Sequence, residues 1–287
     1  MKKVQKCIIV DNVQREVLLL SGSIGFIGPG KMAGAIINGL VSTNFTDTEN
    51  IYIYGRGQER IAYFGKMGCS VCDSVDEMAE KCSIIFLCIK PQNFPEIYEK
   101  LKPVVSNKNL YVSIAAGITF EELKKNLGFE MRFIRAMPNT PLLIGKGVTA
   151  LCRTDNVGDD EYAKVKQIFS SCGLTCDIEE EQINTVIAVS GSSPAYIYLF
   201  AETVADYAAE KGLQRETAKL LFAQSLIGSA SMMNETGLSE DELIQMVSSK
   251  GGTTVAAVDA LKSGGFTEVI RKAMDACINR AEELAKG

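Results

Sequence analysis

Histidine is absent from this 287-residue chain. Its absence removes the side chain that most often transfers protons near neutral pH, and also the commonest zinc ligand. Triads that depend on histidine and histidine-containing metal sites are therefore excluded, and we expect no bound metal. Any chemistry that the protein performs must borrow its reactive atom from a bound molecule.

Long apolar runs and blocks of basic residues are also lacking. No stretch approaches the roughly 18 apolar residues that span a bilayer, and the amino end lacks the apolar core of an export signal. The net charge is -5, with 46% apolar and 23% charged residues. An acidic balance without a basic block argues against nucleic acid or an anionic membrane as partner. We therefore expect a cytoplasmic protein that acts on a small molecule.

The chain has nine cysteines, an odd number that could not pair fully within one chain, and we expect reduced thiols. The stretch CSVC (Cys69 to Cys72) has the spacing of half a zinc site, but no second Cys-x-x-Cys completes it. It lies in a predicted short strand, where residues three apart face opposite sides. We therefore expect both cysteines to be buried structural residues.

Short apolar segments alternate with helical patterns over residues 21–178, after an amino-terminal extension of residues 1–20. This alternation predicts an α/β fold with a doubly wound parallel sheet of the Rossmann type. Most of the segments are near-continuous apolar runs, as expected where helices cover both faces of a sheet. The predicted strands are Ile24–Ile27, Ile51–Tyr54, Ile84–Ile89, Tyr111–Ile114, Arg132–Ala136 and Val148–Cys152.

Helical signals alone occupy residues 179–287, which predicts a second, all-helical domain. One helix is defined by Ser193 as N-cap, Pro194 as first helical residue and Gly212 as stop. Its segment 195–209 is apolar nearly all round and has to be buried, which a homo-oligomer would achieve.

Three further helices follow in this second domain. Ser239 and Glu242 have the spacing of a capping box, and Gly237 ends the helix before it. Another helical pattern runs from about Thr254 to Ser263.

The stretch SIGFIGPGKMAGAI (Ser23 to Ile36) crowds four glycines and a proline between two apolar runs. Gly28 to Ala33 fits G-x-G-x-x-G/A, directly after a predicted strand and before a predicted helix. In that context Gly28 allows the tight turn, Gly30 lets a pyrophosphate approach the backbone, and the helix start offers amides to the phosphates. The motif predicts dinucleotide binding, with a merely structural turn as the alternative.

The end of the second predicted strand bears on the choice of dinucleotide. It reads Tyr54-Gly55-Arg56-Gly57-Gln58 and offers no carboxylate for a ribose 2′-hydroxyl. Arg56 stands where a 2′-phosphate needs a cation. The sequence therefore favours NADPH, with NADH as the alternative and a solvated Arg56 as the plain reading.

Two later stretches also follow predicted strands, where ligands of such sheets bind. Lys90 and Pro91 come after the third strand, and Ala115 and Ala116 after the fourth. The small alanines would let the nicotinamide end of the cofactor come close. Lys90 either orients the cofactor through its backbone or is solvated.

The helical domain holds one other concentrated signal, VSSKGGTTVAAVDALKSGG. Its serines, glycines and threonines immediately precede the helix that starts near Thr254. A helix start with exposed amides and hydroxyl groups is a ready site for a substrate carboxylate. The alternative is an ordinary helix cap.

The motifs IGFIGPGKMAGAI, IKPQN, SIAAGIT, RAMPNTP, SGSSPAY and VSSKGGTT occur in this order and spacing. With them the chain resembles the pyrroline-5-carboxylate reductase family, whose members catalyse the last step of proline biosynthesis. The similarity runs from about Ser23 to the carboxyl end. It implies a Rossmann domain and a helical domain that interlocks with a second subunit, commonly in a ring of five dimers.

The resemblance also implies roles for single residues. The substrate would lie among Ser249, Gly252, Thr253 and Thr254, with the loop amides on its carboxylate and the catalytic Thr254 hydroxyl near the ring nitrogen. The implied cofactor contacts are Gly28, Gly30, Lys31, Met32, Arg56, Lys90, Pro91, Ala115 and Ala116.

Three features depart from the family pattern. Lys250 stands where the family usually has proline, and Ser74 or Val75 stands where it often has an asparagine near the adenine ribose. The extension of residues 1–20 is also unusual. None of the three removes a group that the reaction requires.

Two other functions remain as alternatives. Relatives of the 3-hydroxyacid dehydrogenases join similar domains but use a lysine after the Rossmann domain, and NTVIAVSGSSPAY contains none. A non-catalytic dinucleotide-binding regulator would bind NADPH without turnover, and the intact Ser249 to Thr254 loop argues against it.

Overall fold

The computed structural model describes residues 22–285, so the predicted extension of residues 1–20 lies outside the described residues. The chain forms two compact units. The described part of the first unit comprises residues 22–191 and 278–285, and the second unit is Ser192–Cys277. The domain boundary expected between residues 178 and 179 stays a prediction.

The first unit is built on an eight-stranded sheet with the strand order β3-β2-β1-β4-β5-β6-β7-β8. Every pairing is parallel except that of β6 with β7. The fold is therefore the predicted Rossmann-type α/β fold. The strands are β1 (Ser23–Ile27), β2 (Ile51–Tyr54), β3 (Ser70–Val71), β4 (Cys82–Leu87), β5 (Leu110–Ser113), β6 (Arg132–Pro138), β7 (Gly147–Arg153) and β8 (Gly173–Asp177).

The antiparallel pairing of β6 and β7 departs from the predicted parallel sheet. Ala136 of β6 lies opposite Leu151 of β7 in this pair. The connection holds only the short 3-10 helix η3 (Thr140–Ile144). A parallel neighbour needs a crossover of a dozen or more residues, so the chain turns back on itself here.

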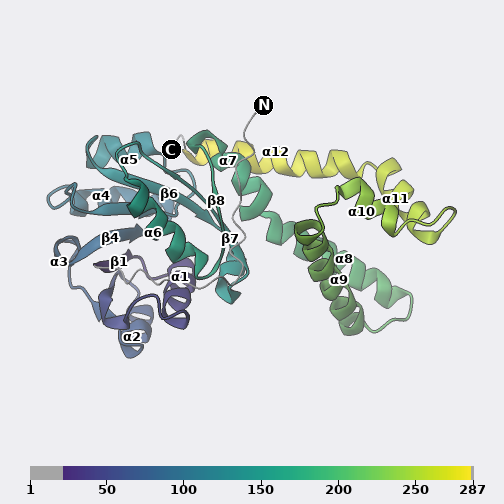
Figure 1. Ribbon diagram of the computed structural model, residues 1–287, viewed down its shortest axis with the longest axis horizontal. Helices are drawn as coiled ribbons and strands as arrows, with labels where there is room; N and C mark the ends of the chain where they lie inside the picture. The colour runs from purple at the N-terminus through teal and green to yellow at the C-terminus, as the bar shows by residue number, and fades with distance from the viewer. Residues whose placement is uncertain (1–21, 286–287) are drawn as a thin grey trace. The chain divides into compact units, whose positions relative to one another are not determined.

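Helices cover both faces of the sheet (Figure 1). Residues of α1 (Lys31–Ser42), α2 (Gln58–Lys66) and α6 (Asp159–Ser170) share one apolar cluster with the sheet. Residues of α3 (Val75–Lys81), α4 (Phe94–Leu101), α5 (Phe120–Leu127) and α7 (Ile183–Val186) share a second cluster. Two covered faces explain why the strands read as apolar runs without alternation.

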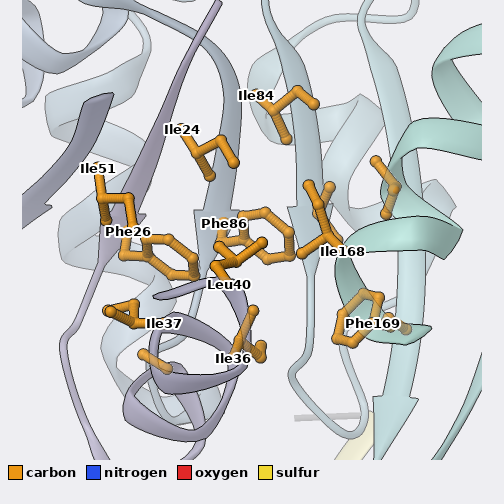
Figure 2. Close-up of a cluster of buried hydrophobic side chains, with 14 of the residues drawn as sticks. Ile24, Phe26, Ile36, Ile37, Leu40, Ile51, Ile84, Phe86, Ile168 and Phe169 are labelled. Atoms are coloured by element: carbon orange, nitrogen blue, oxygen red, sulfur yellow. The ribbon is translucent and has the colours of Figure 1, made fainter. Parts of the chain in front are cut away.

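The first cluster is centred on aromatic side chains from neighbouring strands, as Figure 2 shows. The rings of Phe26 and Phe86 stack with their centroids 4.8 Å apart, and Phe169 of α6 meets Phe86 edge-on at 5.8 Å. All three side chains are fully buried. This packing holds β1 and β4 side by side, which places the turns that follow both strands at one edge of the sheet.

The CSVC stretch behaves as predicted. Cys69 and Cys72 flank the short strand β3, and they belong to different apolar clusters on opposite faces of the sheet. Both are buried, and burial raises the pKa of the Cys72 thiol to about 11. Over residues 22–285, no group of three or more Cys, Asp or Glu side chains is placed to hold a metal ion.

The second unit contains α8 (Ser193–Glu210), α9 (Arg215–Glu235), α10 (Glu240–Met246), α11 (Thr253–Ser263) and most of α12 (Phe266–Ala285). The predicted N-cap of α8 is off by one residue: Ser192 holds the cap position, and its side chain makes no cap hydrogen bond. The ring of Pro194 restricts φ in the first turn of α8. This helix start therefore needs no hydroxyl cap.

The other helix boundaries of this unit follow the prediction. Gly212 and Gly237 take φ angles of 89° and 70° just after α8 and α9, a conformation that favours glycine. The capping box of Ser239 and Glu242 is formed at the start of α10.

The apolar residues of α8 and α9 are not buried by this chain alone. Tyr198 and Leu199 of α8 are each 64% exposed, and Leu220 of α9 is 72% exposed. Within residues 22–285 no helix is long and apolar enough to cross a membrane. The burial predicted for segment 195–209 is thus not provided by the described residues 22–285.

Candidate cofactor site and substrate loop

A cavity of about 340 Å³ lies in the first unit at the carboxyl ends of β1, β2 and β4. Backbone hydrogen bonds fasten these ends together: the Gly28 amide donates to the Tyr54 carbonyl and the Cys88 amide to the Ile27 carbonyl, both at 2.8 Å. The cavity is lined by Ile27, Gly28, Pro29, Gly30, Tyr54, Gly55, Arg56, Gly57, Arg60, Cys88, Ile89, Lys90, Asn93, Glu96, Ile97 and Lys100.

The glycine-rich turn has two positions with different needs. Gly28 has a φ of 89°, and a Cβ there would lie 2.6 Å from Cγ2 of Ile89, so a side chain is excluded. Gly30 faces open space, since the nearest atom to a Cβ there is the Gly28 carbonyl oxygen at 4.0 Å. A ligand can therefore approach the backbone at Gly30. This geometry fits the diphosphate of a dinucleotide.

Helix α1 begins directly after this turn and presents its first amides. The first α-helical hydrogen bond is that of the Gly34 amide to the Gly30 carbonyl at 3.0 Å. The amides of Lys31, Met32 and Ala33 precede it and lack an acceptor within the helix. Together with the positive end of the helix dipole, they form an anion-binding end.

Arg60 of α2 braces the turn, a role that the sequence analysis missed. Its Nε and Nη2 donate to the carbonyl oxygens of Pro29 and Gly30, each at 3.2 Å. Gly34 makes room for this guanidinium, because a Cβ there would lie 2.5 Å from Nη2 of Arg60. These bonds occupy carbonyl groups, so they hold the turn and leave the amides of Lys31, Met32 and Ala33 at the start of α1 available to a ligand. The sequence signal that could have revealed this role is the presence of a second arginine shortly after Arg56.

The stretch Tyr54 to Gln58 offers no carboxylate of its own, but α4 brings one to the end of β2. Glu96 of α4 lies beside Arg56, and its Oε2 accepts a hydrogen bond from Nη2 of Arg56. The two residues are 40 positions apart in the chain, so only the packing of α4 beside β2 reveals the pair. Arg56 itself lines the cavity as predicted.

A second cation completes this corner of the cavity. Lys100 lies one turn after Glu96, and its Nζ donates to Oε1 of Glu96 at 3.0 Å and to Oη of Tyr54 at 3.2 Å. The hydrogen bond from Lys100 and the charge of Arg56 lower the pKa of the Glu96 carboxyl. The hydrogen bond to Glu96 raises the pKa of Lys100. The corner thus holds two cations and one carboxylate.

Of the four residues predicted for the nicotinamide side, one lines the cavity and three do not. Lys90 lines the cavity, and its carbonyl accepts from the Asn93 amide at 2.9 Å within the turn that leads into α4. Pro91, Ala115 and Ala116 do not line it, and neither do Lys31 and Met32. Ala115 is buried just beyond the end of β5.

Ser74 and Val75, which stand where the family often has an asparagine, have structural roles. The Ser74 side chain caps α3 by accepting from the Glu77 amide at 3.1 Å, and Val75 is buried. Neither residue lines the cavity. Arg56, Glu96 and Lys100 are the charged groups at the end of β2 instead.

The predicted substrate loop lies in the second unit and opens α11. Gly251 has a φ of 71°, and the Gly252 amide donates to the Ser249 carbonyl at 2.9 Å. A Cβ at Gly252 would lie 2.5 Å from Oγ of Ser249 and 3.0 Å from its carbonyl oxygen, so a side chain there would require the Ser249 hydroxyl to move. Gly252 holds the N-cap position of α11, and no side-chain cap hydrogen bond is formed there.

The start of α11 repeats the arrangement at the start of α1. The first α-helical bond runs from the Ala256 amide to the Gly252 carbonyl at 3.3 Å, so the amides of Thr253 and Thr254 precede it. Thr253 is exposed and Thr254 half-buried. Ser248, which sequence reasoning did not single out, has a buried hydroxyl with no hydrogen-bond partner among the described residues.

A Rossmann-type sheet with a glycine turn that opens a helix defines a dinucleotide-binding protein. Two family models match the chain. Residues 23–117 match the model described as NADP oxidoreductase coenzyme F420-dependent, and residues 180–284 match the model described as pyrroline-5-carboxylate reductase dimerisation.

The chain belongs to the pyrroline-5-carboxylate reductase family, which confirms the resemblance. It is 38% identical to the pyrroline-5-carboxylate reductase of Escherichia coli over 92% of this chain and 98% of the relative. The corresponding structure from Coxiella burnetii has a TM-score of 0.87 and 36% identity, covering 93% of this chain and 100% of that one. The pyrroline carboxylate reductase of Plasmodium falciparum, solved with NADP bound, has a TM-score of 0.83 and 30% identity over 92% and 98%.

Proposed function

We propose that this protein reduces 1-pyrroline-5-carboxylate to L-proline, the last step of proline biosynthesis, with NADPH as hydride donor and NADH as the alternative. The family supports the reaction. The observation that carries the proposal is the cavity at the carboxyl ends of β1, β2 and β4, where a glycine turn opens onto unpaired helix amides.

The cofactor would lie along this cavity and would supply the hydride when bound. The diphosphate would lie against the backbone of Gly28 and Gly30, and the amides of Lys31 and Met32 would donate hydrogen bonds to its oxygens. Arg56 would meet the 2′-position of the adenosine ribose.

The nicotinamide half would continue past the turn after β4. Lys90 and Pro91 would border it there, and Ala115 and Ala116 would leave room for the ring. This assignment rests on the position of both segments after parallel strands of a Rossmann-type sheet.

The substrate would be held by the start of α11. The amides of Thr253 and Thr254 would bind its carboxylate, Ser249 would add a hydroxyl, and the Thr254 hydroxyl would form a hydrogen bond with the ring nitrogen.

The reaction asks little acid chemistry of the protein. Once the ring nitrogen has taken a proton from water, the imine carbon accepts a hydride, and the C=N electron pair passes to nitrogen. The protein must orient the ring against the cofactor, exclude water and hold the nitrogen. A chain without histidine can do this.

Thr254→Ala tests the assignment. The variant should keep NADPH affinity and lose catalytic efficiency worth about 1–3 kcal/mol, the scale of a lost polar contact to an ionic substrate. Consumption of NADPH with pyrroline-5-carboxylate is the measurement. Ser263→Ala removes a hydroxyl from the opposite end of the same helix and should leave the rate unchanged.

The same assay separates the alternatives. An unchanged rate in Thr254→Ala would remove Thr254 from the mechanism. Turnover of 3-hydroxy acids in the reverse direction would favour the dehydrogenase alternative. NADPH binding without any turnover would favour a regulator.

We also propose that residues 179–287 form the helical dimerisation domain after a Rossmann domain of residues 21–178, and that five homodimers assemble into a decamer. The exposed apolar residues of α8 and α9 support association through the second unit. Light scattering of the purified protein gives the mass. A cytoplasmic location stays a prediction.

A further inference from the structure

The charged corner at the end of β2 contains Glu96 and Lys100 beside Arg56. Its carboxylate bonds both cations, since the Arg56 guanidinium lies on Oε2 of Glu96 and the Lys100 ammonium on Oε1. All three residues line the cavity. A ligand that enters this corner therefore meets an anion that already holds the two cations.

The three side chains are open to rearrangement. Their exposed fractions are 68% for Arg56, 44% for Glu96 and 40% for Lys100. Ion pairs as exposed as these are weak, because water solvates both partners. The 2′-substituent of a bound ribose can therefore displace Glu96 from the two cations. It can equally displace the cations from Glu96.

The two forms of the cofactor differ in charge only at the ribose 2′-position. A phosphate monoester carries about -1.5 to -2 charges near neutral pH, so it is attracted by Arg56 and Lys100 and repelled by Glu96. A 2′-hydroxyl is neutral and can donate a hydrogen bond to a carboxylate. Glu96 thus acts in opposite directions on the two ligands.

On the basis of the proposed function, we propose that Glu96 is the residue that limits selectivity for the 2′-phosphate. It accepts a hydrogen bond from a 2′-hydroxyl and opposes a 2′-phosphate, so NADH is admitted alongside NADPH. Lys100 offsets part of this opposition. The pair of cations alone would make a strictly phosphate-selective corner.

Glu96→Gln tests this because it removes the charge and keeps the shape. The probes are adenosine 2′,5′-bisphosphate and adenosine 5′-monophosphate, which differ only in the 2′-phosphate and need no turnover. Calorimetric titration of the full chain should show the affinity ratio shifting toward the bisphosphate by on the order of tenfold, the effect of one charge on a nearby phosphate in water.

The matched control is Glu99→Gln. Glu99 lies on the same helix, pairs with Lys102 at 2.6 Å and does not line the cavity. It changes the net charge equally, so it should leave the affinity ratio unchanged. A ratio unchanged in Glu96→Gln, or shifted equally in Glu99→Gln, overturns the proposal for Glu96.

These outcomes are separate from those of the proposed function. A shifted ratio without any reduction of pyrroline-5-carboxylate would overturn the reductase activity and uphold the role of Glu96. Reductase activity with an unshifted ratio would overturn only the role of Glu96. Binding of neither nucleotide, together with no reduction of pyrroline-5-carboxylate, would overturn both.

Discussion

The two units of the chain bury their apolar residues to very different extents. The first unit packs two continuous apolar clusters against a central sheet. The second unit, Ser192–Cys277, fully buries only Pro194, Ala205 and Ala218. A helical unit with so little buried surface gains little stability from its own packing. The first unit buries its apolar residues within the one chain, whereas the described residues leave those of the second unit exposed.

The difference also concerns the two helix starts that the proposed function uses. At α1, Arg60 braces the turn and the sheet fixes the strand before it. At α11, the turn is closed by its own backbone and by the close approach of Ser249 to Gly252. The start of α1 is held by tertiary packing, whereas the start of α11 is held by local structure.

The largest expected effect is the loss of a central ring in the first unit. Phe86→Ala removes the side chain that joins Phe26 to Phe169, and it should lower the free energy of unfolding by about 3–5 kcal/mol. Urea unfolding followed by circular dichroism measures this. The same substitution at Phe129, which is 73% exposed, should change the stability little. Equal losses at both positions would contradict the contrast in packing.

A smaller effect is expected from an exposed apolar residue of the second unit. Leu220 is 72% exposed in the single chain. Leu220→Glu replaces this apolar side chain by a charged one, and it should weaken self-association by about 1.5–3 kcal/mol, which is the free energy gained by burying a leucine. Light scattering over a dilution series measures the mass.

Ile144 provides the control for Leu220. It is 76% exposed but lies in the first unit, so Ile144→Glu should leave the mass unchanged. An unchanged mass in Leu220→Glu would mean that the apolar surface of α9 is not the interface.

Much of the fold could be predicted because its signals are local. Strands buried on both faces read as apolar runs, and the turn after β1 needs Gly28 for a backbone conformation that other residues rarely adopt. The strand β8 (GLTCD) was missed for the opposite reason. It is an edge strand with only Thr175 buried, so its sequence shows no apolar run.

The charged corner of the cofactor site could not be predicted in the same way. Arg56 follows a strand and carries a local signal, but Glu96 and Lys100 lie on a helix about 40 residues later. Their approach to Arg56 depends on how α4 packs against the sheet through Ile97 and Leu101. Pattern reading along the chain has no access to such a contact, and a carboxylate in the site was therefore overlooked.

The smallest expected effect compares one carboxylate from each unit. Hydrogen bonds and charge lower the pKa of Glu96 through Lys100 and Arg56, and that of Glu242 through the Ser239 amide and hydroxyl. A lowered folded-state pKa gives stability that is present above the ordinary carboxyl pKa and is lost as the pH falls through the folded-state value. Replacement of either glutamate by glutamine should therefore reduce stability near neutral pH and have no effect in strong acid.

Salt should separate the two carboxylates. The contribution of Glu96 comes from exposed ion pairs, which salt screens, whereas Glu242 accepts short hydrogen bonds of 2.8 and 2.7 Å within its own capping box. Urea unfolding of each glutamine variant and the unchanged protein, at low and high ionic strength, measures this. The effect of Glu96→Gln should fade with salt and that of Glu242→Gln should persist. Equal salt dependence would mean that both carboxylates act mainly through charge, and that the capping box adds no distinct local contribution.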